Sequence, residues 1–214
     1  MPRPVEICII ARHAESAYNV AGLVNGDPAV PVALSPHGVE QACSLAGQLA
    51  GAGVGACVHT RFGRTLETAR LALEGCAPPP AFVCEPLLDD IGCGAMEGRP
   101  VADEHAWRGA HARDCRPPGG ESIRDAALRI ARGLGAVASR PEPVVAIVSH
   151  DLVVRYAVNA ARGSADIAAP WREAPHATAF RIEQRALIEA ADRIGALAAS
   201  PWGRAIPGPE ANGG

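Results

Sequence analysis

The sequence predicts an α/β fold, a three-layer sandwich in which helices flank a mostly parallel central sheet. Short apolar runs alternate along the chain with longer segments whose apolar residues recur at helical spacing. Such alternation is typical of a sheet with helices packed on it. The run Val144-Val145-Ala146-Ile147-Val148 contains no polar residue, as expected of a parallel strand buried on both faces. We find no linker, so we expect residues 1–199 to form one domain and the Pro/Gly-rich residues 200–214 to form a disordered tail.

The first elements follow from local signals. Residues 7–11 form an apolar run that predicts the opening strand. Residues 20–32 are rich in Gly, Asn, Asp and Pro, which predicts a loop over the end of that strand. Ser35 followed by Pro36 is typical of a helix start. We expect that helix to end at the glycine-rich residues 51–55.

The next segments repeat the pattern of strand and helix. Residues 56–60 and 81–84 are short and apolar and predict the second and third strands. Residues 61–74, between them, have helical spacing and carry Arg64 in the first turn, where free N–H groups and the helix dipole favour an anion. Residues 87–98 predict an acidic loop after the third strand.

The second half of the chain continues the alternation. Its expected elements are helices over 101–114, 123–134, 152–161 and 185–198 and strands over 144–148 and 178–182. The strand over 144–148 leads into Ser149-His150-Asp151, so a histidine follows this strand as His13 follows the first.

Composition limits the function. A formal net charge of -3 provides no general attraction for nucleic acid or anionic membranes, so an anion site must be a local cluster of positive groups. All 20 basic residues are arginine, which excludes lysine Schiff-base and Walker-lysine chemistry. The 7 cysteines lack metal-like spacing and favour reduced thiols. With no targeting signal or membrane-spanning run in view, we expect a cytoplasmic protein that binds neither nucleic acid nor membrane; homodimerisation stays open.

Four residues with phosphate chemistry fall at the ends of strands or at the start of a helix: Arg12, His13, Arg64 and His150. Ligands bind at the carboxyl ends of strands in open α/β sheets. The planar fork of arginine suits phosphate oxygens, and a neutral imidazole can attack phosphorus when its other nitrogen holds the proton. A carboxylic acid on the loop after the third strand could protonate the leaving alkoxide and then act as base toward water. The other histidines match no metal-binding spacing, so we expect no metal and no cofactor.

Several motifs occur in a set order over most of the chain. They are Arg12-His13-Ala14-Glu15-Ser16 with Asn19, then Asn25-Gly26, Arg64 with Thr68-Ala69, Pro118-Gly119-Gly120-Glu121-Ser122 and Val148-Ser149-His150. In this order the chain resembles the histidine phosphatase superfamily, in the branch that contains cofactor-dependent phosphoglycerate mutases and many small phosphatases. The resemblance implies a phosphoglycerate mutase-like fold.

The resemblance also implies roles for individual residues. His13 would be the phosphorylated nucleophile. Arg12, Arg64 and His150 would hold the phosphoryl oxygens and stabilise their developing charge.

The same resemblance implies the residues around the substrate. Asn19 would be a further phosphate donor, and Asn25 with Gly26 would line the substrate mouth. We expect substrate specificity to depend on the loops over residues 20–32, 87–111 and 168–178, which the sequence cannot place.

The chain departs from the family pattern at the acid. Asp90 occupies the position where the family commonly has glutamate, and the neighbouring Asp89 is an alternative acid. Ala14 replaces a glycine, and Asp151 replaces the common glycine after His150. Asp151 could weaken anion binding or hold His150 protonated, and the direction is open.

Other polar residues have structural interpretations. Glu15 could either orient an arginine through an ion pair or take a direct part in catalysis. Glu97 and Glu121 are expected to be loop or cap carboxylates. His176 precedes the last expected strand and could return toward the pocket rim.

These observations predict a metal-independent phosphatase that hydrolyses a small-molecule phosphomonoester through a phosphohistidine on His13, with Asp90 as proton donor. One alternative is a phosphoglycerate mutase-type isomerase. The run over residues 90–120 looks short for the cover that encloses a mutase intermediate, which favours water as acceptor. Another alternative is a phosphate-binding module without turnover.

Overall fold

The computed structural model describes residues 5–164 and 173–200, and the expected tail over 200–214 lies outside them except for Ser200. Its centre is a five-stranded sheet in the order β3-β2-β4-β1-β5. The strands are β1 (Ile7–Arg12), β2 (Ala56–His59), β3 (Ala81–Cys84), β4 (Val144–Ser149) and β5 (Ala179–Glu183). Only β5 runs antiparallel to its neighbour β1. The predicted strands and the mostly parallel sheet are therefore confirmed.

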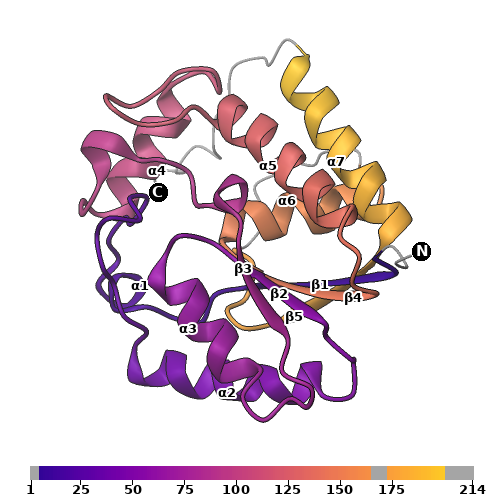
Figure 1. Cartoon of the computed structure of the whole chain (residues 1–214). Coiled ribbons are helices and arrows are strands. Elements are labelled where there is room, and N and C mark those ends of the chain that lie inside the picture. Colours follow the sequence, from indigo (N-terminus) through magenta and orange to yellow (C-terminus); the bar gives the residue numbers. More distant parts are fainter. Residues whose placement is uncertain (1–4, 165–172, 201–214) are drawn as a thin grey trace, which may run out of the picture.

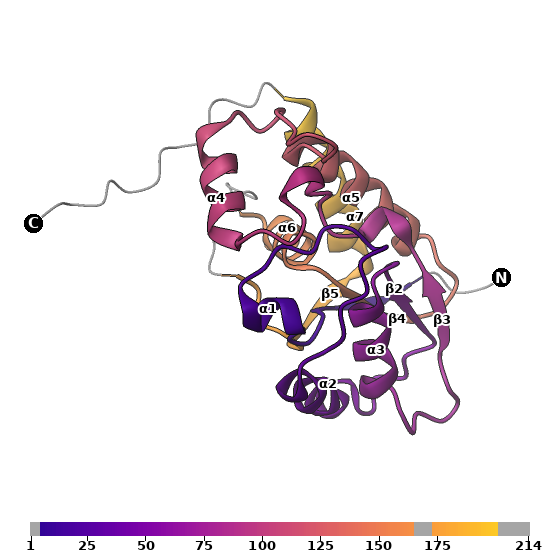
Figure 2. The ribbon, with the colours of Figure 1, turned by 90° about the vertical axis from the view of Figure 1, so that its left-hand side faces the viewer.

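Helices cover both faces of the sheet (Figure 1). One face carries α2 (Pro36–Leu49) and α3 (Gly63–Ala72), and the other carries α5 (Ile123–Ala138), α6 (Asp151–Ala161) and α7 (Gln184–Ala199). Two shorter helices, α1 (Ala17–Ala21) and α4 (Val101–Ala110), lie beyond the ends of the strands, on the side away from the start of β1 (Figures 1 and 2). The 3₁₀ turns η1 (Pro86–Leu88) and η2 (Gly94–Met96) lie in the loop between β3 and α4. The predicted three-layer sandwich is confirmed.

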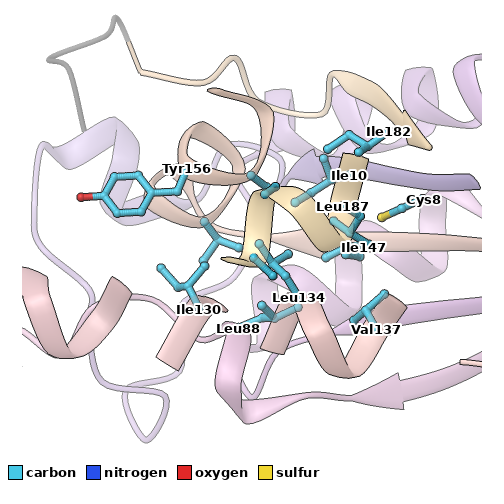
Figure 3. Packing of buried hydrophobic residues seen from close by; sticks show 14 of the residues in the cluster. Cys8, Ile10, Leu88, Ile130, Leu134, Val137, Ile147, Tyr156, Ile182 and Leu187 are labelled. Carbon is cyan, nitrogen blue, oxygen red and sulfur yellow. The ribbon is translucent and has the colours of Figure 1, made fainter. Parts of the chain in front are cut away.

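The alternation of side chains along β1 builds a core on each face. Cys8 and Ile10 point into the cluster with α5, α6 and α7, whereas Ile9 and Ala11 point into the cluster with α2 and α3. Figure 3 shows the larger cluster, in which Leu134 of α5 packs near the sheet residues. Because both faces of β1 are buried, this strand reads as a continuous apolar run from Ile7 to Ala11.

The structure contains a helix that the sequence did not predict, α1, which overlaps the start of the loop expected over residues 20–32. Ser16 and Asn19 form a capping box: the Ser16 N–H donates to Asn19 Oδ1 over 2.9 Å, and Ser16 Oγ accepts from the Asn19 N–H over 3.3 Å. This pair of bonds satisfies the free donors of a helix start. The expected helix over 101–114 is also shorter and ends at Ala110.

No helix in the described part of the chain is long and apolar enough to cross a membrane.

Candidate active site

The strand order brings the predicted residues together at the carboxyl ends of the parallel strands. Because β4 lies between β2 and β1, the residues that follow these three strands are neighbours. Arg12 is in register with Ser149, and the His13 N–H donates to Ser149 O over 2.8 Å. His150 in turn reaches Thr60 after β2, with 2.9 Å between His150 Nε2 and Thr60 Oγ1. The site is thus built from backbone positions that the sheet defines.

His13 is buried with a defined tautomer. Its Nδ1 lies 2.7 Å from Ala14 O, and since a carbonyl only accepts, Nδ1 carries the proton. Nε2 accepts from Arg64 Nε over 3.0 Å and so carries the lone pair. Burial, and then the charges of Arg64 and Arg12, lower the pKa of His13 well below its usual value. The ring is a neutral imidazole with a basic nitrogen toward the guanidinium.

Arg64 occupies the centre of the site. Its Nη2 lies 3.1 Å from Asp90 Oδ2, 3.1 Å from His150 Nδ1 and 3.1 Å from Asn25 O, and its Nη1 donates to Asn25 Oδ1. The guanidinium lies 4.3 Å from the centre of the Phe62 ring. Each donor therefore already points at an acceptor that a phosphoryl oxygen could replace.

Arg12 holds an unused donor. Its Nη1 donates to Glu173 Oε2 and to Ala174 O, each over 2.9 Å. Its Nε is buried and has no hydrogen-bond partner among the described residues. An unsatisfied buried donor costs about 1–3 kcal/mol. An oxyanion bound beside Arg12 would remove that cost.

His150 is also neutral. Arg64 can only donate, so His150 Nδ1 accepts and its Nε2–H donates to Thr60 Oγ1. Burial, and then the charge of Arg64, lower the pKa of His150 well below its usual value. Asp151 therefore does not hold His150 protonated, which was one of the two effects left open for it. Asp151 instead accepts from Arg155 Nε over 2.8 Å.

The two candidate acids are separated in space. Asp90 lines the same cavity as His13, and burial raises its pKa, opposed by Arg64. Asp89 is buried against Arg61, whose Nε donates to Asp89 Oδ2 over 2.6 Å, and it lines a neighbouring cavity. Of the two, Asp90 is placed to reach a substrate at His13.

Arg129 organises the loop that carries Asp90. Its Nη1 donates to Leu87 O and Asp89 O over 2.9 Å each, and its Nη2 donates to Asp90 O over 3.1 Å. Glu121 holds the guanidinium from the other side, with bonds of 2.9 and 2.7 Å. The expected loop carboxylate Glu121 thus acts through Arg129 on the position of Asp90.

The predicted substrate residues divide into two groups. Asn19 and Asn25 line the cavity. Gly26 does not: a Cβ on it would lie 2.5 Å from Ile91 O, so the glycine packs against the acidic loop. Gly26 lines the neighbouring cavity instead, and its N–H donates to Glu97 Oε2 over 2.7 Å, so its place at the substrate mouth stays a prediction.

Glu15 and His176 support the site from outside it. Glu15 has no ion pair with an arginine among the described residues; its Oε1 accepts from Ser35 Oγ over 2.6 Å, at the N-cap of α2. His176 lies beside β1, where its Nδ1 donates to His13 O over 2.7 Å, and it is not among the residues that line the cavity. The two side chains hold the backbone on either side of the nucleophile.

The cavity at His13 has a volume of about 150 Å³. Part of the wall of this cavity was not predicted from the sequence, because spacing alone does not show which way the exposed face of a short helix points. The lining residues are Arg12, His13, Ser16, Tyr18, Asn19, Leu23, Val24, Asn25, Arg64, Asp90, Ile91, Cys93, Val101, Glu104, Asp151 and Glu173. Within residues 5–164 and 173–200, no three His, Cys, Asp or Glu side chains form a group that could hold a metal ion.

Comparison with known proteins identifies a family. The model of the histidine phosphatase superfamily (branch 1) matches residues 8–185. Among curated proteins, the chain is 30% identical to the probable phosphoglycerate mutase GpmB of Proteus mirabilis over 155 residues, which cover 68% of this chain and 69% of the relative. A GpmB of Erwinia tasmaniensis is 29% identical over 164 residues, which cover 72% and 74% of the two chains.

Solved structures share the fold. The alpha-ribazole phosphatase from Shigella flexneri aligns with a TM-score of 0.71 at 23% identity, over 83% of this chain and 90% of that chain. A mycobacterial glucosyl-3-phosphoglycerate phosphatase aligns with a TM-score of 0.68 at 23% identity, over 83% and 92%. At this level of identity the likeness concerns the fold alone.

Proposed function

The chain belongs to branch 1 of the histidine phosphatase superfamily, and we propose that it is a metal-independent phosphatase that hydrolyses a small-molecule phosphomonoester. One observation carries the proposal: a neutral His13 with its lone pair on Nε2 lies beside two guanidinium groups and a carboxyl group of raised pKa in one cavity. These are the groups that phosphoryl transfer requires.

The first step is transfer of the phosphoryl group to the enzyme. His13 Nε2 forms a bond to phosphorus while the bond from phosphorus to the ester oxygen breaks, and protonated Asp90 gives its proton to that oxygen. The donors of Arg64 move from His13, His150 and Asp90 to the phosphoryl oxygens. Arg12 Nε, which has no partner among the described residues, donates to a phosphoryl oxygen as well.

The second step releases phosphate. Asp90, now a carboxylate, takes a proton from a water molecule whose oxygen attacks phosphorus. The bond between phosphorus and His13 Nε2 breaks, inorganic phosphate leaves, and Asp90 is protonated again. The cycle consumes only the ester and water.

The first test is labelling of the nucleophile. We expect brief mixing with a ³²P-labelled phosphomonoester to leave acid-labile, base-stable label on the wild type. His13→Ala should lose the label and lower kcat at least about 10³-fold, since it removes the nucleophile. His176→Ala is a control that keeps Nε2 of His13, so it should retain label. Unchanged turnover in His13→Ala would overturn the proposal.

A mutase is the second candidate, because curated relatives are named probable phosphoglycerate mutases. It would use the same phosphohistidine but return the phosphoryl group to a second hydroxyl. Incubation with 3-phosphoglycerate tests the second candidate: a mutase forms 2-phosphoglycerate without releasing phosphate, whereas a phosphatase forms no 2-phosphoglycerate.

The third alternative, binding without turnover, rests on the aspartate in the acid position. The 3.1 Å distance from Asp90 Oδ2 to Arg64 Nη2 argues against it, since the shorter side chain still reaches the centre of the site. Calorimetric binding of phosphate without turnover on a wide panel of phosphomonoesters would favour this alternative.

A further inference from the structure

We infer that the site selects phosphomonoesters whose alcohol part carries no second anionic group, and that Glu104 on α4 rejects such a group. The inference rests on the proposed function and adds the substrate class. It follows from the distribution of charge on the cavity wall.

The positive charge of the wall is concentrated at the nucleophile. Of the described residues that line the cavity, Arg12 and Arg64 are the only cationic ones, and both lie beside His13. A phosphoryl group on His13 takes up both guanidinium groups. A second anionic group in the same substrate would then find no arginine among these lining residues.

The remaining charged residues of the wall are four carboxylates: Asp90, Asp151, Glu173 and Glu104. Asp90 is the acid of the proposed reaction. Asp151 Oδ1 accepts from the Ala174 N–H over 2.7 Å. Glu173 accepts from Arg12. Their position is therefore near the phosphate end of the cavity.

Glu104 lies in a different part of the wall. It comes from α4, with its side chain only 11% exposed. The cavity is also lined by Val101, one turn before Glu104 on α4, by Leu23, whose backbone pairs with Pro100, and by Tyr18. Arg108, one turn further along α4, pairs with Glu104 but does not line the cavity. The carboxylate, and not the guanidinium, is thus the group that α4 presents to a substrate.

This arrangement favours one class of alcohol. A hydroxyl or ammonium group can donate to the Glu104 carboxylate while the carbon skeleton contacts Leu23 and Val101. A carboxylate or second phosphate would instead meet the Glu104 carboxylate, whose oxygens can only accept and whose charge the pair with Arg108 offsets in part, so its binding is disfavoured. Neutral or cationic phosphomonoesters are therefore the expected substrates, and phosphoglycerates and bisphosphates are not.

The test uses three phosphonates of similar size, whose C–P bond resists hydrolysis. They are 2-aminoethylphosphonate, propylphosphonate and 2-carboxyethylphosphonate, each measured by calorimetry on the full chain at a pH above their second ionisation. We expect the carboxyethyl compound to bind at least about fivefold more weakly than the propyl compound, and the aminoethyl compound at least as tightly as the propyl one. The difference should shrink at high salt.

The variant Glu104→Gln tests the assignment to this residue. It keeps the shape and an acceptor for Arg108, so the penalty on the carboxyethyl compound should fall by at least about threefold. Glu40→Gln, on the exposed face of α2, is the matched control and should leave the ratios unchanged.

The outcomes separate the two proposals. Equal or tighter binding of the carboxyethyl compound overturns the inference while leaving the phosphatase reaction standing. A penalty that persists in Glu104→Gln overturns the role of Glu104. Failure of all three compounds to bind overturns both the inference and the phosphoester site. Binding in the expected order, without any phosphohistidine label in the labelling experiment, overturns only the proposed reaction.

Discussion

At the scale of single residues, the site is a hydrogen-bond network in which Arg64 occupies side chains that would otherwise contact the substrate. Its guanidinium bonds His13 Nε2, His150 Nδ1 and Asp90 Oδ2, which are the three groups that act on the phosphoryl group in the proposed reaction. A dianion offers stronger acceptors than two imidazole nitrogens. Entry of substrate therefore releases the nucleophile and the acid together.

The role of Asp90 is testable through the leaving group. Burial raises its pKa above 3.8, so the protonated form persists to higher pH than in a free carboxylic acid. We expect Asp90→Asn to lower kcat/KM for alkyl phosphates by about 10²–10³-fold, since an alkoxide leaves poorly without a proton. p-Nitrophenyl phosphate, whose phenolate needs no proton, should still label His13 in a burst.

Asp89→Asn is the matched control for this prediction, because Asp89 is one residue away but bonded to Arg61. It should keep the wild-type dependence on the leaving group. The assignment fails if Asp89→Asn, and not Asp90→Asn, acquires that dependence.

At the scale of elements, the loop between β3 and α4 depends on Arg129 of α5, a positioning residue. Arg129→Leu removes the donors to three backbone carbonyls around Asp90. A small displacement of a catalytic group costs up to about 10²-fold. We expect kcat for alkyl phosphates to fall about 10–100-fold with little change in KM, and the loss to be smaller for p-nitrophenyl phosphate.

Arg140→Leu provides the comparison for Arg129→Leu. Arg140 makes an equally bidentate pair with Glu142, of 3.0 and 2.7 Å, at the opposite end of β4. It should lower stability without changing the dependence on the leaving group. Equal kinetic effects of the two variants would show that Arg129 has only a structural role.

Helix α2 offers a second prediction at this scale, because two of its glycines have different surroundings. A Cβ on Gly38 would lie 2.0 Å from Glu15 O, whereas a Cβ on Gly47 meets nothing within 4 Å. We expect Gly47→Ala to stabilise the fold by about 0.5–1 kcal/mol through helix propensity. Gly38→Ala should destabilise it by about 1–3 kcal/mol, because the clash forces the helix away from the backbone beside His13.

Urea unfolding of both variants measures these changes directly. Gly38→Ala should also lower kcat, since Glu15 follows the nucleophile by two residues, whereas Gly47→Ala should keep it. Stabilisation by both alanines would contradict the close approach of α2 to the site.

At the scale of the whole molecule, the buried histidines couple the site to stability. His13 and His150 are 3% and 0% exposed, and both have a pKa well below 6.5 in the folded chain. Below pH 6.5 the unfolded chain takes up protons on them and the folded chain does not. The stability they provide is therefore complete above about pH 6.5 and is lost as the pH falls.

We expect the free energy of unfolding to fall between pH 7.5 and 5.5 by about 1 kcal/mol for each of these two histidines. Urea titrations at several pH values measure the slope. The double variant His13→Gln/His150→Gln should flatten it, whereas His37→Gln, with its side chain 65% exposed, should not. An equal slope in the double variant would mean that other groups cause the pH dependence.

The sequence by itself determined the layers and most of the element boundaries. Apolar runs such as Val144–Ser149 have the composition of buried parallel strands, and Ser35-Pro36 and Ser122 begin helices through local backbone bonds. These signals are local, so they can be read without the rest of the chain. The order of motifs likewise indicated that Arg12, His13, Arg64 and His150 would share one site.

Only the tertiary structure decided how the site is completed. The choice between Asp89 and Asp90 depends on the path of a loop held by Arg129, which lies about forty residues away in sequence. Gly26 turned out to pack on that loop, and Glu104 faces the cavity because of how α4 is docked. Spacing along the chain specifies which residues share a face, but the direction of that face is set by long-range packing.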